Sequence, residues 1–261
     1  MANLTDPARE LGEVASRLSH AADMNGASYL AEKFGVEPWS TPFYRIVACI
    51  MERIELVERT VRASEMDSDH IDSAVEDLDG LREAFSGRTL THKWNQAGLG
   101  STLMTTHGRA MRYLSNVVRD RISYPALSDD EVGELIDLID TYREDLEESD
   151  EGPPFVRQAI LEGIAQFRFQ LLNVAWLGSG YALIAFRELS IIYDAAQRQY
   201  RSEDLDSEAA LNGLLTVLRS FKEKIESAKG WADAGGTVWK AYQIGSGVVA
   251  PFLIGHSING G

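Results

Sequence analysis

Apolar residues recur along most of the chain at the spacing of an α-helix. The clearest example follows Thr41-Pro42, a helix-start signal, where positions i, i+3, i+4 and i+7 are apolar. This stripe consists of Ile46, Val47, Ile50, Met51, Ile54, Val57 and Val61. Charged residues, Arg53 among them, occupy the intervening positions and are expected to cover the opposite side of the helix. Strand-like alternation is nearly absent, so the pattern predicts an all-α protein.

Helix-start and helix-stop residues divide the chain into seven or eight predicted helices. Asp6-Pro7 is an N-cap followed by a first-turn proline, and it predicts a helix that continues to about Phe34 with a bend at Gly26. The sequence Ser-Asp-Asp-Glu at 128–131 is a capping box and predicts a further helix start. Other helices are expected at 67–86, 102–121 and 207–229.

The segment 155–193 is strongly apolar. Two helices joined near Gly178-Ser-Gly180 explain it best, because helices that are apolar nearly all round belong at the centre of a fold. The run Phe169–Phe186 has no charge over 18 residues, a length that also approaches a membrane span. Its Gln170 and Asn173, together with the glycine break, favour a buried pair instead. We therefore predict a central apolar helical hairpin at 155–193 with the other helices around it.

The domain organisation is predicted to be simple. Residues 1–240 should form a single helical domain, with the acidic, proline-ended stretch 148–154 as a candidate sub-boundary. Residues 241–261 form a glycine-rich apolar tail without formal charge. Its apolar members are Tyr242, Ile244, Val248, Val249, Phe252, Leu253 and Ile254. Burying one such side chain contributes about 1.5–3 kcal/mol, so we expect the tail to contact its own body, a protein partner, a second copy or a membrane interface.

The net charge and the single cysteine limit which partners and which cellular compartment are expected for this protein. The chain has 25 Lys or Arg residues against 40 Asp or Glu residues, a formal net charge of −15. Such a charge opposes binding to nucleic acid and to anionic lipid. The single cysteine, Cys49, lies in an apolar run, where a buried thiol in a reducing compartment is expected. With no secretory signal in the first residues, we expect a cytoplasmic location, with peripheral membrane contact through the tail as an extension.

The segment 87–119 differs from the rest because it has five Lys or Arg residues and no Asp or Glu. A glycine-rich stretch before a helix can present backbone N–H groups to a phosphate. The candidate ligand residues are His92, Gly98, Gly100, Ser101, His107, Arg109 and Arg112. The competing interpretation is structural, because residues 120–151 carry 13 acidic residues against two Arg. In that interpretation the basic and acidic segments pair within the fold.

Motifs for catalytic or metal chemistry are missing from the sequence. It has no G-x-S-x-G elbow, no P-loop and no H-E-x-x-H pair. We therefore predict no catalytic residue, no metal and no cofactor. The preferred hypothesis is a non-enzymatic protein that acts through association, an effector or adaptor whose tail engages a partner or membrane. The alternatives are an enzyme or binding protein for a phosphorylated or nucleotide ligand that uses segment 87–119, and a structural homo-oligomer with a swapped tail.

Overall fold

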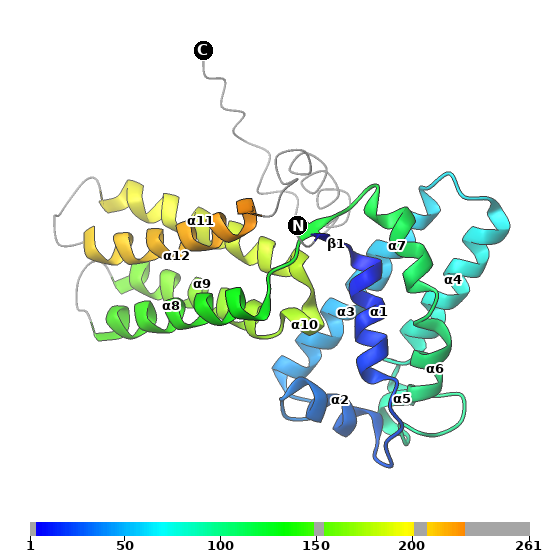
Figure 1. Cartoon of the computed structure of the whole chain (residues 1–261). Coiled ribbons are helices and arrows are strands. Elements are labelled where there is room, and N and C mark those ends of the chain that lie inside the picture. The colour runs from blue at the N-terminus through cyan, green and yellow to red at the C-terminus, as the bar shows by residue number, and fades with distance from the viewer. Residues whose placement is uncertain (1–3, 149–153, 201–207, 228–261) are drawn as a thin grey trace.

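The described part of the chain is almost entirely helical, as the hydrophobic pattern predicts (Figure 1). The computed structural model describes residues 4–148, 154–200 and 208–227. Its helices are α1 (Pro7–Leu18), α2 (Gly26–Phe34), α3 (Thr41–Arg62), α4 (Ser68–Glu83), α5 (Gly87–Thr91), α6 (Gly100–His107), α7 (Met111–Arg119), α8 (Asp129–Glu148), α9 (Pro154–Leu172), α10 (Val174–Leu177), α11 (Ser179–Tyr200) and α12 (Glu208–Ser227). The strands β1 (Leu4–Thr5) and β2 (Tyr124–Pro125) form one short antiparallel pair, with Leu4 opposite Pro125.

The helices form two groups that lie side by side (Figure 1), and each group encloses its own hydrophobic core. Helices α1 to α7 surround the first core, and α8, α9, α11 and α12 surround the second. The chain passes from one core to the other between Tyr124 and Leu127. Short α10 lies between α9 and α11 in the sequence, yet its Leu177 is buried in the first core. This helix therefore ties the two halves together.

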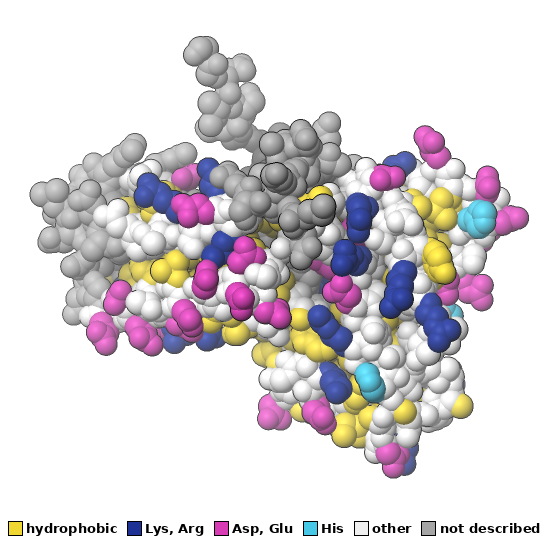
Figure 2. Space-filling view, viewed as in Figure 1, with side chains coloured by type: hydrophobic (Ala, Val, Ile, Leu, Met, Phe, Trp, Pro, Cys, Tyr) yellow, Lys and Arg dark blue, Asp and Glu magenta, His cyan; other side chains and the backbone are white. Residues whose placement is uncertain are grey.

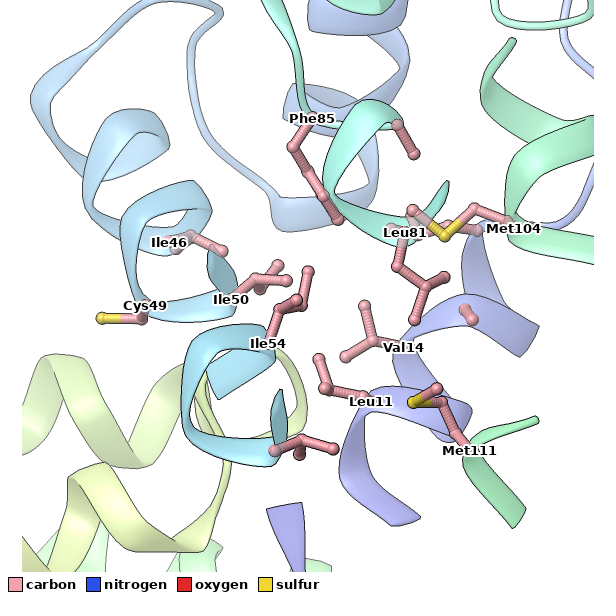
Figure 3. Close-up of a cluster of buried hydrophobic side chains, with 14 of the residues drawn as sticks. Leu11, Val14, Ile46, Cys49, Ile50, Ile54, Leu81, Phe85, Met104 and Met111 are labelled. Atoms are coloured by element: carbon pink, nitrogen blue, oxygen red, sulfur yellow. The ribbon is translucent and has the colours of Figure 1, made fainter. Parts of the chain in front are cut away.

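The first core is centred on the apolar stripe of α3 (Figure 3). Five stripe residues are fully buried as predicted, whereas Val47 and Met51 lie at the edge of the core. The buried five are Ile46, Ile50, Ile54, Val57 and Val61. Side chains from α1, α6, α7 and the region of α4 converge on them: Leu11, Val14, Leu81, Phe85, Met104 and Met111.

Cys49 is also buried, on the side of α3 that points away from the centre of this cluster (Figure 3). Burial raises the pKa of its thiol to about 11, and the nearby Glu52 carboxylate adds to the shift. Such a thiol is almost entirely protonated at neutral pH, and the protonated form is a poor nucleophile. The expectation of a buried cysteine is confirmed.

Two predicted helices are interrupted. The helix expected from Asp6 to Phe34 is split, because α1 ends at Leu18 and α2 starts at Gly26 behind its N-cap Asn25. The helix expected at 102–121 is split into α6 and α7. A straight helix of that length would measure about 30 Å, whereas α1, against which it packs, measures about 18 Å. The break lets both halves pack on α1.

The second core is a four-helix arrangement. Helix α8 packs on α9 and α12, and α11 packs on the same two helices, so the four form a closed ring. The predicted capping box opens α8: the N–H of Ser128 donates to Oε2 of Glu131 at 2.7 Å, and the N–H of Glu131 donates to Oγ of Ser128 at 3.3 Å. Between α8 and α9, Arg168 donates two hydrogen bonds to Asp140, at 2.6 and 2.9 Å.

A buried ion pair joins the two halves. Arg53 of α3 is 4% exposed, and its Nη2 donates to the carbonyl oxygen of Trp176 in α10 at 2.6 Å. Its Nη1 lies 3.8 Å from Oε2 of Glu10, and Oε1 of Glu10 accepts a hydrogen bond from the N–H of Ser179 at 2.9 Å. Burial raises the pKa of Glu10, and the charge of Arg53 opposes that shift. The expectation that Arg53 faces solvent is wrong, because its charge is paired inside the joint.

A single hairpin at the centre of the whole chain is not confirmed. Helices α9 and α11 pack on each other, but they are two of four helices around the second core, and the first core has its own centre. Phe167, Leu171 and Leu189 are fully buried, whereas Trp176 and Phe186 are only partly buried. Among the described residues, no helix is both long enough and apolar enough to cross a bilayer.

The candidate sub-boundary at 148–154 connects α8 to α9, and both of these helices line the second core. Residues 149–153 of that connection and the whole apolar tail 241–261 lie outside the described residues. The predictions for the tail therefore stay predictions.

Candidate interaction surfaces

The predicted phosphate-binding segment wraps around a buried tryptophan. Gly98 and Gly100 have positive φ angles of 75° and 24°, and a Cβ on Gly100 would overlap the carbonyl oxygen and ring of Trp94. Trp94 is fully buried, and its indole N–H donates to the carbonyl oxygen of Leu18 at 3.0 Å. The backbone N–H of Ser101 donates to the Trp94 carbonyl at 3.0 Å. This N–H already has an acceptor. Gly100 serves close packing against Trp94, whereas Gly98 has open space around it and serves the positive φ of the turn.

The two candidate histidines are engaged elsewhere. His107 is the last residue of α6, about 10 Å along the helix from Gly100. Its Nδ1 lies 2.9 Å from Oδ1 of Asp77 in α4. His92 is exposed, and its Nδ1 lies 2.8 Å from the carbonyl oxygen of Arg88. The histidines and the glycine segment therefore do not converge on one bound anion.

The arginines of the same segment form a different feature, a basic strip on α7. Arg112, Asn116 and Arg119 are exposed, and their spacing of four and three residues puts them on one face of α7. The exposed Arg109, in the turn just before the helix, extends the strip. Arg119 also lies 3.6 Å from the buried Asp6, which caps α1. Figure 2 shows Lys and Arg side chains gathered over this side of the first half, and acidic side chains along α8. The basic strip is an open surface in an otherwise acidic protein.

An exposed aromatic corner lies where α2 leads into α3. The side chains of Trp39 and Tyr44 are 45% and 53% exposed, and their ring centroids are 6.1 Å apart. Both rings also contact the buried Phe43, each at a centroid distance of 5.7 Å. The backbone of Trp39 is left-handed, with φ 62°. We call Trp39 and Tyr44 the aromatic corner.

A tight turn holds the aromatic corner in place. The N–H and the hydroxyl of Ser40 both donate to the carbonyl oxygen of Glu37, at 3.2 and 2.6 Å. The hydroxyl of Ser40 in turn accepts from the N–H of Phe43 and caps α3. On the next turn of α3, the guanidinium of Arg45 lies 4.5 Å from the ring centre of Phe169 in α9.

Sequence reasoning missed the aromatic corner and the buried ion pair. The corner had a signal, because three aromatic residues fall within the six positions 39–44, next to a predicted helix start. The pair of Glu10 and Arg53 had none, since two charges on separate amphipathic helices resemble ordinary surface residues. Within the described ranges, no three His, Cys, Asp or Glu side chains gather as a metal site would require.

No protein family matches the sequence, and comparisons with curated proteins and with solved structures give no match either.

Proposed function

We propose that this protein is a non-enzymatic helical protein that acts through association, and that the aromatic corner is its contact for a protein partner. The observation that carries the proposal is the backbone of Trp39. Among the described residues it is the one non-glycine residue with a positive φ. A left-handed conformation costs a bulky residue about 1–2 kcal/mol. Strain of this kind is concentrated at sites of function.

The exposure of the aromatic corner supports the proposal that its rings bind a protein partner rather than pack in the core. A strained tryptophan that served only the core would be expected to be buried, yet Trp39 and Tyr44 each leave about half of the side chain in water. Tryptophan, tyrosine and arginine are the residues most enriched among those that dominate binding energy. Aromatic side chains also lose little conformational entropy when a partner covers them. Arg45 follows directly in the sequence, and its guanidinium lies over the ring of Phe169 in α9.

The apolar tail 241–261 is the second element of the proposal. We expect Tyr242, Val248, Phe252 and their apolar neighbours to engage a partner or a membrane interface when the tail is released from its own body. The phosphorylated-ligand alternative gains no support from the geometry, because His107 is held by Asp77 and the N–H of Ser101 is occupied. Enzymatic activity therefore stays the less favoured hypothesis.

The test is a binding experiment with matched aromatic variants. Wild-type protein, Trp39→Ala/Tyr44→Ala and Phe155→Ala are used as baits in a lysate of the source cells, and recovered proteins are quantified by mass spectrometry. Phe155 is a suitable control because it is 67% exposed and lies at the start of α9, in the second half. The recovered partner is then purified and titrated against each variant.

We expect Trp39→Ala alone to weaken binding about 30-fold, the effect of losing a residue worth about 2 kcal/mol. Phe155→Ala should bind as wild type does. Deletion of residues 241–261 should leave a folded helical protein that binds its protein partner more weakly. A partner that binds the Trp39→Ala/Tyr44→Ala variant with unchanged affinity, or the lack of any partner whose recovery depends on these two residues, contradicts the proposal.

A further inference from the structure

The basic strip on α7 has a counterpart of opposite charge on α8. Exposed acidic residues follow one face of α8 at helical spacing, and we call them the acidic strip: Asp130, Glu134, Asp137, Glu144 and Glu148. Asp130, Asp137 and Glu144 repeat every seven residues, and so do Arg112 and Arg119 on α7. Seven helical residues span about 10.5 Å. The two strips therefore present opposite charges at the same interval.

These two strips do not neutralise each other within the chain. Helix α7 packs mainly on α1 and α3, whereas α8 packs on α9 and α12. In the part of the chain that the structure describes, Arg109 and Arg112 form no ion pair, and neither do Asp137 and Glu144. The sequence allowed intramolecular ion pairs between segments 87–119 and 120–151. Arg109, Arg112, Asp137 and Glu144 do not form such pairs with other described residues.

Helix stability explains only part of the placement of the charges, since Arg119 in the last turn of α7 and Asp130 in the first turn of α8 agree with the helix dipoles. Cations near a helix N-terminus and anions near a C-terminus oppose the helix dipole. Arg112 lies in the first turn of α7, which contains no acidic residue. Glu144, Glu147 and Glu148 lie near the end of α8, whose last turn contains no basic residue. Arg112 and Glu144 thus oppose the dipoles of their own helices, an arrangement that an external partner of opposite charge would stabilise.

We propose that the basic strip of one copy binds the acidic strip of a second copy, so that the protein forms a symmetric dimer. Figure 2 shows basic side chains of the first half and acidic side chains of α8 on the same face of the molecule. When two copies meet through that face about a two-fold axis, each basic region lies over the partner's acidic region.

This dimer is expected to be weak and sensitive to salt. Two copies of net charge −15 repel each other at long range, so only the local complementarity of the strips holds them together. Exposed ion pairs are screened as ionic strength rises. The proposal is independent of the aromatic corner and of the tail, which lie in other parts of the sequence.

The test uses sedimentation velocity and paired charge reversals. Variant one is Arg109→Glu/Arg112→Glu, and variant two is Asp137→Lys/Glu144→Lys. All four positions are exposed, so both variants should fold, as circular dichroism will check. Wild-type protein should dimerise at low salt and dissociate at high salt. Each variant alone should be monomeric, and an equimolar mixture of the two should dimerise again, because every contact then joins opposite charges.

Matched variants separate local from global charge effects. Arg88→Glu changes the net charge as Arg112→Glu does, but on α5, outside the basic strip. We expect Arg112→Glu to weaken the dimer at least about tenfold more than Arg88→Glu, and deletion of residues 241–261 to leave the dimer intact. The proposal is overturned if the wild-type protein is monomeric at low salt, if the mixture stays monomeric, or if both reversal variants still dimerise.

Discussion

Replacing Gly178 with alanine tests whether the buried ion pair holds the two halves together. Gly178 has φ 89° and ψ 161°, a backbone region that is essentially restricted to glycine and costs other residues about 1–3 kcal/mol. The added Cβ would overlap Oε2 of Glu10 and lie 2.9 Å from Cζ of Arg53. Both side chains are buried, so they have no room to turn away. Breaking a buried pair costs about 3–5 kcal/mol, and we expect Gly178→Ala to lose at least about 4 kcal/mol of unfolding free energy.

The measurement is urea unfolding followed by far-ultraviolet circular dichroism, with Gly133→Ala as the control. Gly133 lies inside α8, and nothing lies within 4 Å of a Cβ added there. The same chemical change at that position should raise stability by up to about 1 kcal/mol through helix propensity. A loss of about 4 kcal/mol is a large fraction of the roughly 5–15 kcal/mol that stabilises a typical domain. If Gly178→Ala unfolds at the wild-type midpoint, the argument for the joint is refuted.

Three further outcomes are expected. Leu171→Ala should lower the free energy of unfolding by about 2–5 kcal/mol, because Leu171 is fully buried in the second core; a thermal melt with no shift would contradict this. The thiol of Cys49, with its pKa raised to about 11 by burial, should react slowly with a thiol reagent in the native protein and fully in denaturant; fast native labelling would be inconsistent with its burial. The hydrogen bonds from Arg168 lower the pKa of Asp140, so the stability from this pair is present above the unfolded pKa of about 3.9 and is lost as pH falls through the lower folded pKa. Asp140→Asn should therefore cost up to about 1 kcal/mol at pH 7 and almost nothing below that range, as urea titrations at several pH values will measure; a cost that is the same at every pH would argue against the pairing.

Local signals predicted helices well, because the interactions behind them are local. The capping box at 128–131 and the apolar stripe of α3 depend on residues within one or two turns, and both are present as expected. The failures involve distant contacts. The break between α6 and α7 depends on the length of α1, and the burial of Arg53 depends on Glu10 and on the carbonyl of Trp176. Neither is visible in a short window of sequence.

Prediction of the candidate sites was also limited by what a short window of sequence contains. The sequence identified Arg109 and Arg112 as unusual, but it grouped them with the glycine segment, which is occupied in packing around Trp94. The aromatic corner was overlooked because its significance depends on the left-handed backbone of Trp39. The backbone conformation of a residue, and whether its side chain has a partner, are decided by the folded structure and cannot be predicted from a local sequence pattern.

Several locally unfavourable features of this protein lie at its surface. Natural proteins tend to break local rules where they function. Among the buried titratable groups, Glu10 is paired with Arg53 and the Cys49 thiol stays protonated. The departures at the surface are the strained, half-exposed Trp39 and the charges of Arg112 and Glu144, which oppose the dipoles of their own helices. Surfaces that are locally unfavourable in the isolated chain become favourable when another protein covers them, and this is the physical basis for the proposed function.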